Sequence, residues 1–403
     1  NVQPLYNLGL PLLGLLVALG GSLLVILRYV SRGRDPQITS VVPEYLAEPP
    51  SDLSPGVVGA LLDERVDVRD VIAVIMDLAR RGYIVIEETR TNGFLGISSS
   101  SFTFKRTDKA FEGLRQFEQL VMKRIFDTKD ERTLESLRNR FYVSIPEIQR
   151  AMYGALVEEG LFAHSPASVR TGWSTAGSTL LILAFGGFFV GTGLIDSTSP
   201  AILCLPASLG LVGLVMLSFG GHMPAKTEKG ALEAAKWGAF RTYMRNLESY
   251  ASMQEASDLL ASFIPYAIAF NMSNVWLARF REVQVAQIPP WYFPTYLGGP
   301  YGRPYIPGTP MRPHVDMGRG LPGDIVRADD GGFSMDSMSR GLAESMNSMA
   351  SGLESMINSA ARVMTSQPQA SGSSGRWSSG GGSFSGGGFR GGGGSGGGSR
   401  GFG

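Results

Sequence analysis

The sequence is poor in the residues that usually build catalytic and metal centres. Its 403 residues include one cysteine, Cys204, and three histidines, His164, His222 and His314. A single cysteine excludes an intrachain disulfide, and within an apolar run its thiol acts as a small packing residue. Histidines this far apart in the chain give little support for a His-based metal cluster. We therefore predict no catalytic, cofactor-binding or metal-binding residue.

Motifs of common enzyme and ligand-binding classes are also absent. The chain has no HExxH, CxxC, GxSxG, EF-hand or Walker pattern. Carboxylate neighbours such as Asp63-Glu64, Glu87-Glu88 and Glu158-Glu159 are adjacent in sequence. Adjacent residues on a helix point about 100° apart, so we interpret these pairs as solvated surface. We expect neither an enzyme nor a self-contained transporter, and no small-molecule substrate is identified.

Charge is missing from three long runs, Leu8–Leu27, Thr175–Ile195 and Ala201–Phe219, which contain no Asp, Glu, Lys, Arg or His. About 20 such residues in a helix cross the hydrocarbon core of a bilayer. A helix also satisfies every backbone amide within its own segment, as a lipid environment requires. The sequence therefore predicts an integral membrane protein with membrane lipid as its solvent.

Basic residues flank only one end of each span. They are Arg28, Arg32 and Arg34 after the first, Arg170 before the second, and Lys226 and Lys229 after the third. The link 196–200 between the second and third spans has no Lys or Arg. The positive-inside rule therefore places residues 31–172 and 220–403 in the cytoplasm. We expect Asn1 to continue from a longer precursor whose upstream part lies outside the cytoplasm.

The first cytoplasmic segment has the pattern helix, helix, two-stranded ribbon, which is winged-helix-like. Asp67 is placed to cap a helix, and strands are predicted at Tyr83–Glu87 and Phe102–Lys105 around the loop Thr91–Ser101. Residues 45–165 carry 16 basic and 19 acidic side chains, a net charge of −3. Nucleic-acid affinity needs clustered Lys and Arg, so we favour protein interaction or a structural role over nucleic-acid binding.

Further helices are predicted along the chain. They are Phe111–Phe126, Leu134–Phe162 with a new start at Pro146, a helix from the cap Thr227 to about Tyr250, and Gln254–Arg281. A stretch rich in proline and aromatics follows from Ile288 to Pro313. It is predicted either to lie along the bilayer interface or to wrap over the soluble core, and the sequence favours neither alternative.

Two patterns suggest close contacts. Gly187 with Gly191, and Gly14 with Ala18, form small-xxx-small pairs suited to packing within the hairpin or, less favoured, to dimerisation. An amphipathic helix at 335–364 repeats Met, Leu or Ala every three or four residues. Its flexible thioethers suit docking on a protein partner or a second copy, although packing on its own chain is almost as well supported.

The fold class that follows is a mainly α membrane protein with three transmembrane helices, a cytoplasmic α+β winged-helix-like module, a helical second cytoplasmic segment and a disordered Gly/Ser tail. The tail from Ser371 has 17 glycines in 33 residues and cannot bury enough apolar surface to order. The predicted segments are 1–30, the first span; 31–172, the winged-helix-like and helical domain; 173–220, the transmembrane hairpin; 221–285, cytoplasmic helices; 286–333, the Pro/aromatic segment; 334–365, the Met-rich helix; and 366–403, the disordered tail.

The order of these features resembles the YciQ-like predicted membrane protein family of bacteria. The resemblance rests on Pro49–Pro55, Asp70–Ile84, Gly160-Leu-Phe162, the paired spans, the segment from Lys229-Gly-Ala through Gly238-Ala-Phe240, Pro265–Ala269, Trp291-Tyr292 and the Gly/Ser terminus. It implies a bacterial inner membrane and an extracytoplasmic domain upstream of Asn1, and it assigns no catalytic residue. We expect a non-enzymatic scaffold or signal-coupling protein, or alternatively an accessory subunit of a transport or envelope-stress assembly.

Overall fold

The computed structural model describes residues 3–92, 98–195, 199–246, 262–282, 291–294 and 335–368. Within these residues the chain is mostly helical and carries one small sheet. The predicted disordered tail beyond residue 368 and most of the Pro/aromatic segment lie outside the described residues.

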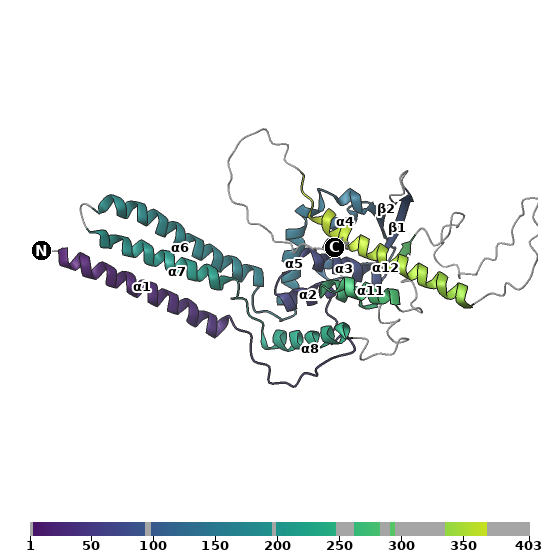
Figure 1. Cartoon of the computed structure of the whole chain (residues 1–403), viewed down its shortest axis with the longest axis horizontal. Helices are drawn as coiled ribbons and strands as arrows, with labels where there is room; N and C mark the ends of the chain where they lie inside the picture. Colours follow the sequence, from purple (N-terminus) through teal and green to yellow (C-terminus); the bar gives the residue numbers. More distant parts are fainter. Residues whose placement is uncertain are drawn as a thin grey trace, which may run out of the picture. The chain divides into compact units, whose positions relative to one another are not determined.

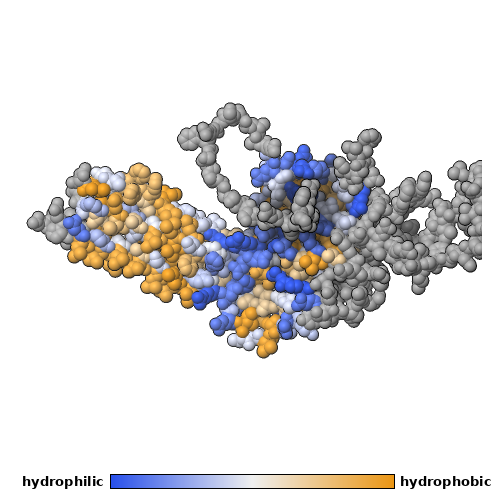
Figure 2. Space-filling model, viewed as in Figure 1, coloured by the Kyte–Doolittle hydropathy of each residue, from blue (hydrophilic) through white to orange (hydrophobic). Residues whose placement is uncertain are grey.

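Three helices are long and apolar enough to cross a membrane. They are α1 (Gln3–Arg32), α6 (Pro166–Leu194) and α7 (Cys204–Gly220), the last preceded by the turn η3 (Pro200–Leu203). They run alongside one another (Figure 1), and hydrophobic residues cover most of the surface visible over them in Figure 2. Large apolar side chains such as Leu16 and Ile182 are about 70% exposed, as expected where lipid is the solvent.

The small residues in these helices lie at contacts within the chain. A Cβ added to Gly187 would lie 3.3 Å from Pro206, and one added to Gly191 would lie 2.8 Å from Leu203. A Cβ on Gly14 would lie 3.0 Å from the backbone oxygen of Cys204. Gly187 and Gly191 of the one predicted small-xxx-small pair, and Gly14 of the other, therefore lie where α6 and α1 pack against the third span, as the favoured prediction of packing within the chain has it.

The remaining elements form the α+β part. It begins with α2 (Pro55–Asp63), α3 (Val68–Arg80), β1 (Ile84–Asn92) and β2 (Ser98–Arg106), the predicted order of helix, helix and ribbon. The sheet order is β3-β2-β1-β4, with β3 (Glu131–Thr133) antiparallel to β2. The strand β4 (Tyr292–Pro294) is parallel to β1, pairing Ile86 with Tyr292.

Four predicted elements had the wrong bounds, for identifiable reasons. Both ribbon strands run further than predicted, because backbone pairing continues through the polar residues from Glu88 to Asn92 and from Ser98 to Ser101. Helix α4 (Gln116–Phe126) begins later than Phe111, after Gly113 with φ +95°. The predicted helix Leu134–Phe162 is the turns η1 (Leu134–Leu137) and η2 (Phe141–Val143) followed by α5 (Ile145–Glu158). Helix α5 begins at Ile145, with Pro146 in its first turn, one residue before the predicted new start.

The second helical segment is also more divided than predicted. Thr227 caps α8 (Glu228–Arg245) by accepting a hydrogen bond from the amide of Gly230, and Asp67 caps α3 as predicted. The predicted helix Gln254–Arg281 is interrupted at Asn271, whose φ of 58° is left-handed, and α11 (Ser273–Glu282) follows. Residues 247–261, which include the predicted end of the helix that starts at Thr227 and the predicted start of the next one, lie outside the described residues.

One hydrophobic core unites these elements with α12 (Met335–Thr365), which crosses the α+β part in Figure 1. Its buried side chains are Met349, Ala350, Leu353, Met356, Ala360, Val363 and Met364. This half of the Met-rich helix therefore packs on its own chain, and the preferred prediction of partner docking is wrong for it. Trp291 and Tyr292 are buried too, so this part of the aromatic segment lies on the core.

The core position of α12 predicts the effect of truncating Met356, which is 1% exposed. Met356→Ala should lower the free energy of unfolding by about 2–5 kcal/mol, because it removes buried methylenes and leaves a cavity. The neighbouring Asn358→Ala, at an exposed position, should change it by less than about 0.5 kcal/mol. Thermal unfolding in detergent measures both, and equal effects would contradict the packing of α12 in the core.

Candidate functional site

A largely buried lysine, Lys226, lies between α7 and the cap of α8. Its side chain is only 7% exposed. Its Nζ lies 2.9 Å from Oδ2 of Asp35, just beyond α1, and 2.5 Å from Oε1 of Glu64, at the end of α2. The backbone amide of Lys226 also donates to Oδ1 of Asp35 at 2.8 Å. We call Lys226, Asp35 and Glu64 the junction.

Backbone contacts hold the junction lysine in place. Lys226 forms an isolated antiparallel bridge with Phe162, and its Nζ lies 5.8 Å from the centre of that ring. Thr227 donates from its amide to the carbonyl of Leu161 at 3.0 Å and from its hydroxyl to that of Gly160 at 2.6 Å. The chain leaving the third span is thus fixed to the segment that precedes the second span.

The junction also includes the second span through Glu64. Glu64 adopts a left-handed conformation with φ 57° as the C-cap of α2, and its carbonyl accepts a hydrogen bond from Arg170 of α6. Glu64 therefore accepts hydrogen bonds from Arg170 in the second span and from Lys226 after the third span, while Asp35 follows the first span. All three spans are connected through side chains to the end of α2.

The electrostatics of the junction favour a charged lysine. Burial lowers the pKa of Lys226, but the hydrogen bonds that its ammonium donates to Glu64 and Asp35 outweigh this effect, and the net shift of the pKa is upward. A raised lysine pKa stabilises the fold at pH below the ordinary value of 10.5, and this contribution is lost only as pH rises through the higher folded-state value. The ion pairs therefore persist throughout the neutral range.

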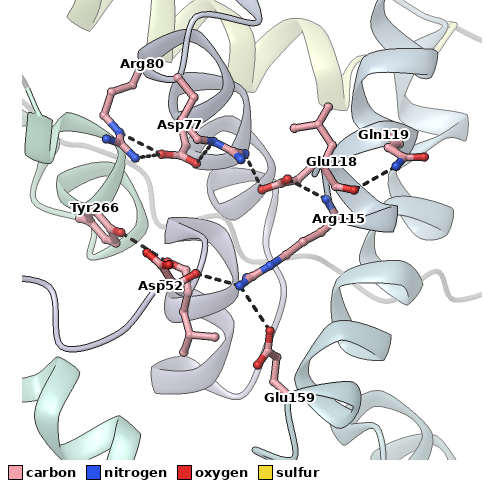
Figure 3. A network of polar contacts seen from close by, with 11 residues as sticks. Asp52, Asp77, Arg80, Arg115, Glu118, Gln119, Glu159 and Tyr266 are labelled. Carbon is pink, nitrogen blue, oxygen red and sulfur yellow. Dashed lines mark hydrogen bonds and ion pairs between the residues drawn. The ribbon is translucent and has the colours of Figure 1, made fainter. Parts of the chain in front are cut away.

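A second polar network braces α3 against α4 (Figure 3). Arg81 lies between two buried carboxylates, 2.9 Å from Asp77 and 2.6 Å from Glu118, and Arg80 adds a 2.7 Å contact to Asp77. Arg115 donates to the carbonyl of Asp52 at 2.8 Å. Both buried carboxylates are therefore paired with arginine, which offsets the cost of removing their charges from water.

A third buried cluster centres on Glu88, which is 1% exposed. Its Oε2 accepts from the hydroxyl of Tyr292 at 2.6 Å, and its Oε1 accepts from Arg90 at 2.7 Å and Ser100 at 2.8 Å. Burial, and then Glu88 itself, raises the pKa of Tyr292, which stays a neutral donor. The interpretation of Glu87-Glu88 as solvated surface is therefore wrong for Glu88.

Helix α12 closes over this cluster at Gly352. A Cβ at this position would collide with both the Tyr292 hydroxyl and the Glu88 carboxylate, so the contact requires glycine. The cluster therefore joins three distant parts of the chain, the ribbon strand β1, the edge strand β4 and α12.

Asp70 is a buried acid of a different kind. Its Oδ2 accepts the amide of Asp67 at 2.7 Å in the capping box of α3. Its Oδ1 is buried without a hydrogen-bond partner in the described part of the chain, and it lies against Gly59. Burial raises the pKa of Asp70 to about 8. Much of this carboxyl population is consequently protonated at neutral pH.

None of these clusters resembles a metal centre. Among the described residues, no group of three or more His, Cys, Asp or Glu side chains could hold a metal ion. No catalytic or cofactor-binding residue is predicted from the sequence, and the junction is not predicted either, because its members are separated by up to 191 residues. The one local signal was Lys226 itself, which was interpreted only as a basic flank.

Comparison with protein families gives one match. The model of the predicted membrane protein (DUF2207) C-terminal domain matches residues 42–280, more than half of the chain. No curated protein and no solved structure matches. The match confirms the predicted resemblance to a family of membrane proteins of unknown function, and it covers the second and third spans together with most of the α+β part.

The raised pKa of Asp70 predicts a pH-dependent penalty. Above its ordinary value of 3.8, the unfolded chain releases this proton while the folded chain keeps it until about pH 8, so stability falls across that range. Asp70→Asn stays neutral and retains an oxygen for the Asp67 amide. Its free energy of unfolding relative to the unmodified chain should therefore rise by about 1 kcal/mol per pH unit over this range.

Denaturation curves at several pH values in detergent measure this difference. Asp108→Asn, at an exposed position, is the matched control and should give a constant offset. A pH-independent difference for Asp70→Asn would show that Asp70 is ionised in the folded chain.

Proposed function

Because this chain belongs to the DUF2207 family of predicted membrane proteins, we propose that it is a non-enzymatic scaffold that couples three membrane helices to a cytoplasmic α+β part. The basic flanks Arg28, Arg32 and Arg34 after the first span support the cytoplasmic placement. The resemblance described above supports a bacterial inner membrane. In this arrangement, a change in the membrane helices reaches the α+β part through defined contacts.

The observation that carries the proposal is the buried position of Lys226 between Asp35 and Glu64. A buried cation separated from its acidic partners is strongly unfavourable, so movement of α1 relative to α2 meets resistance at this point. The pairing spans elements that are otherwise far apart in sequence. It provides the mechanical connection that coupling requires.

The winged-helix-like module is proposed to serve protein contacts and packing rather than nucleic-acid binding. In α3, which corresponds to the recognition helix, every residue from Asp70 to Ala79 is buried. A helix must expose side chains to base edges to enter a groove. The packing of α12 against α3 and the net charge of −3 over residues 45–165 argue in the same direction.

The proposal includes a protein partner or a second copy of the chain, and it restricts where that contact lies. The buried residues of α12 from Met349 to Met364 are occupied by the core of this chain. Any partner therefore binds an exposed surface of the α+β part and not this face. No observation favours the alternative of a transport-assembly subunit over this reading.

The coupling is tested by the variant Lys226→Met, in nanodiscs of two bilayer thicknesses. In the unmodified chain, amide exchange in α2 (Pro55–Asp63) should differ between the two bilayers, because the junction transmits the adjustment of the spans. Lys226→Met should abolish this difference. Since Asp35 and Glu64 are 41% and 25% exposed, the loss of stability should be about 2 kcal/mol, below that of a fully buried pair.

Lys229→Met is the matched control, because it removes the same charge three residues away at an exposed position. It should leave the bilayer dependence of α2 exchange unchanged. Retention of the full dependence in Lys226→Met, with the chain folded, would refute coupling through the junction. A bilayer-independent α2 in the unmodified chain would refute coupling altogether.

A further inference from the structure

A cavity of about 760 Å³ opens at the end of the three spans, beside the junction. Its lining includes Arg28 and Arg32 from α1, Arg34 just beyond it, and His164 before α6. Trp173 of α6 and Met216 of α7 complete an apolar wall. Figure 2 shows hydrophilic residues gathered at one end of the hydrophobic helices. The cavity therefore combines a basic side with an apolar side.

The basic side carries charge that the described part of the chain does not neutralise. Arg28, Arg32 and Arg34 are exposed, and no acidic side chain among the described residues pairs with them. Arg28 and Arg32 lie one helical turn apart and so share a face of α1. The nearby carboxylate of Asp35 is already paired with Lys226. Positive charges held this close repel one another, so an anion bound between them would lower the electrostatic energy.

The apolar side indicates what kind of anion fits. Trp173 and Met216 belong to candidate membrane spans, so this wall continues into lipid-exposed helix surface. Tryptophan side chains are favoured at the level of lipid head groups. A free inorganic anion would use the arginines alone, whereas an amphiphile would use both sides. A volume of several hundred Å³ suits a head group.

We propose that this cavity binds the phosphate head group of an anionic phospholipid, with the acyl chains on the apolar surface of the spans. The guanidinium groups of Arg28 and Arg32 contact the phosphate, since guanidinium donors match phosphate oxygens. Trp173 packs against the glycerol region. The proposal does not require the coupling function and stands on the cavity and its lining.

Binding is tested on the full chain in detergent by native mass spectrometry, with phosphatidylglycerol and phosphatidylcholine as the probes. Phosphatidylglycerol should bind about tenfold or more tightly than phosphatidylcholine, because each basic residue near the head group adds to the affinity. Arg28→Gln with Arg32→Gln should remove this preference. The control pair Arg138→Gln with Arg150→Gln removes two exposed arginines elsewhere and should keep it.

A blocking variant separates a cavity from general surface attraction. Gly172 lines the cavity within α6, and a Cβ there meets no atom within 4 Å. Gly172→Trp therefore fills the cavity while leaving every arginine in place, and it should lower the affinity for phosphatidylglycerol to that for phosphatidylcholine. Ser168→Trp, at a second exposed lining position, provides the same test if the first variant does not fold.

Four results would overturn the proposal, the last of them from competition with glycerol 3-phosphate. The first is an unmodified chain with equal affinity for both lipids, and the second is a retained preference in the double arginine variant. The third is a retained preference in the folded blocking variants, which would assign the attraction to the surface charge of the spans. Glycerol 3-phosphate distinguishes the sources of phosphate. Weak competition supports a lipid, whereas displacement at concentrations equal to those of the lipid would identify a soluble phosphate ligand instead.

Discussion

The burial of one lysine ammonium constrains the arrangement of this protein more than any other single group. Lys226 is far from Asp35 and Glu64 in sequence, by 191 and 162 residues. An ammonium removed from water must keep its partners or lose several kcal/mol, so the chain after α1, the end of α2 and the start of α8 have to meet at one point. The hydrogen bond from Arg170 to the Glu64 carbonyl adds the second span to the same point. The membrane helices and the α+β part therefore share a connection made of side chains as well as covalent links.

Contacts between residues far apart in the sequence also complete the core of the α+β part. The family match ends at residue 280, yet Tyr292 of β4 and the buried half of α12 come later in the chain and are fully enclosed. The Glu88–Tyr292 hydrogen bond and the close approach of Gly352 hold both segments on the sheet. The folding unit of this chain is accordingly larger than the matched domain, since a core that loses α12 exposes the apolar faces of α3 and α11.

The sequence predicted those features that local chemistry determines. The three spans, the Thr227 and Asp67 caps and the helix start at Pro146 follow from composition, capping and proline geometry within a few residues. The burial of Glu88 was missed although a signal existed, because Ile84, Ile86 and Glu88 alternate on one face of β1. The acidic partners of Lys226 at the junction and the surface that α12 covers had no local signal. They depend on pairings across more than 150 residues, which periodicity cannot reveal, and no alternation or cap marks Lys226 as buried.

The junction and the neighbouring cavity divide the basic residues into two kinds. Lys226 lines the cavity, but its ammonium forms ion pairs with Asp35 and Glu64. The arginines of α1, by contrast, have no acidic partner among the described residues. An anion in the cavity would therefore be drawn by the arginines and would also attract Lys226 away from Asp35. If a bound anion lowers the stability of the ion pair, the ion pair lowers the affinity for the anion by the same free energy. This follows because linkage between two binding equilibria is reciprocal. If an anionic lipid binds in the cavity, its binding and the ion pairs that connect α1 to α2 are therefore thermodynamically linked. The link is the ammonium of Lys226, which lines the cavity and also forms those ion pairs.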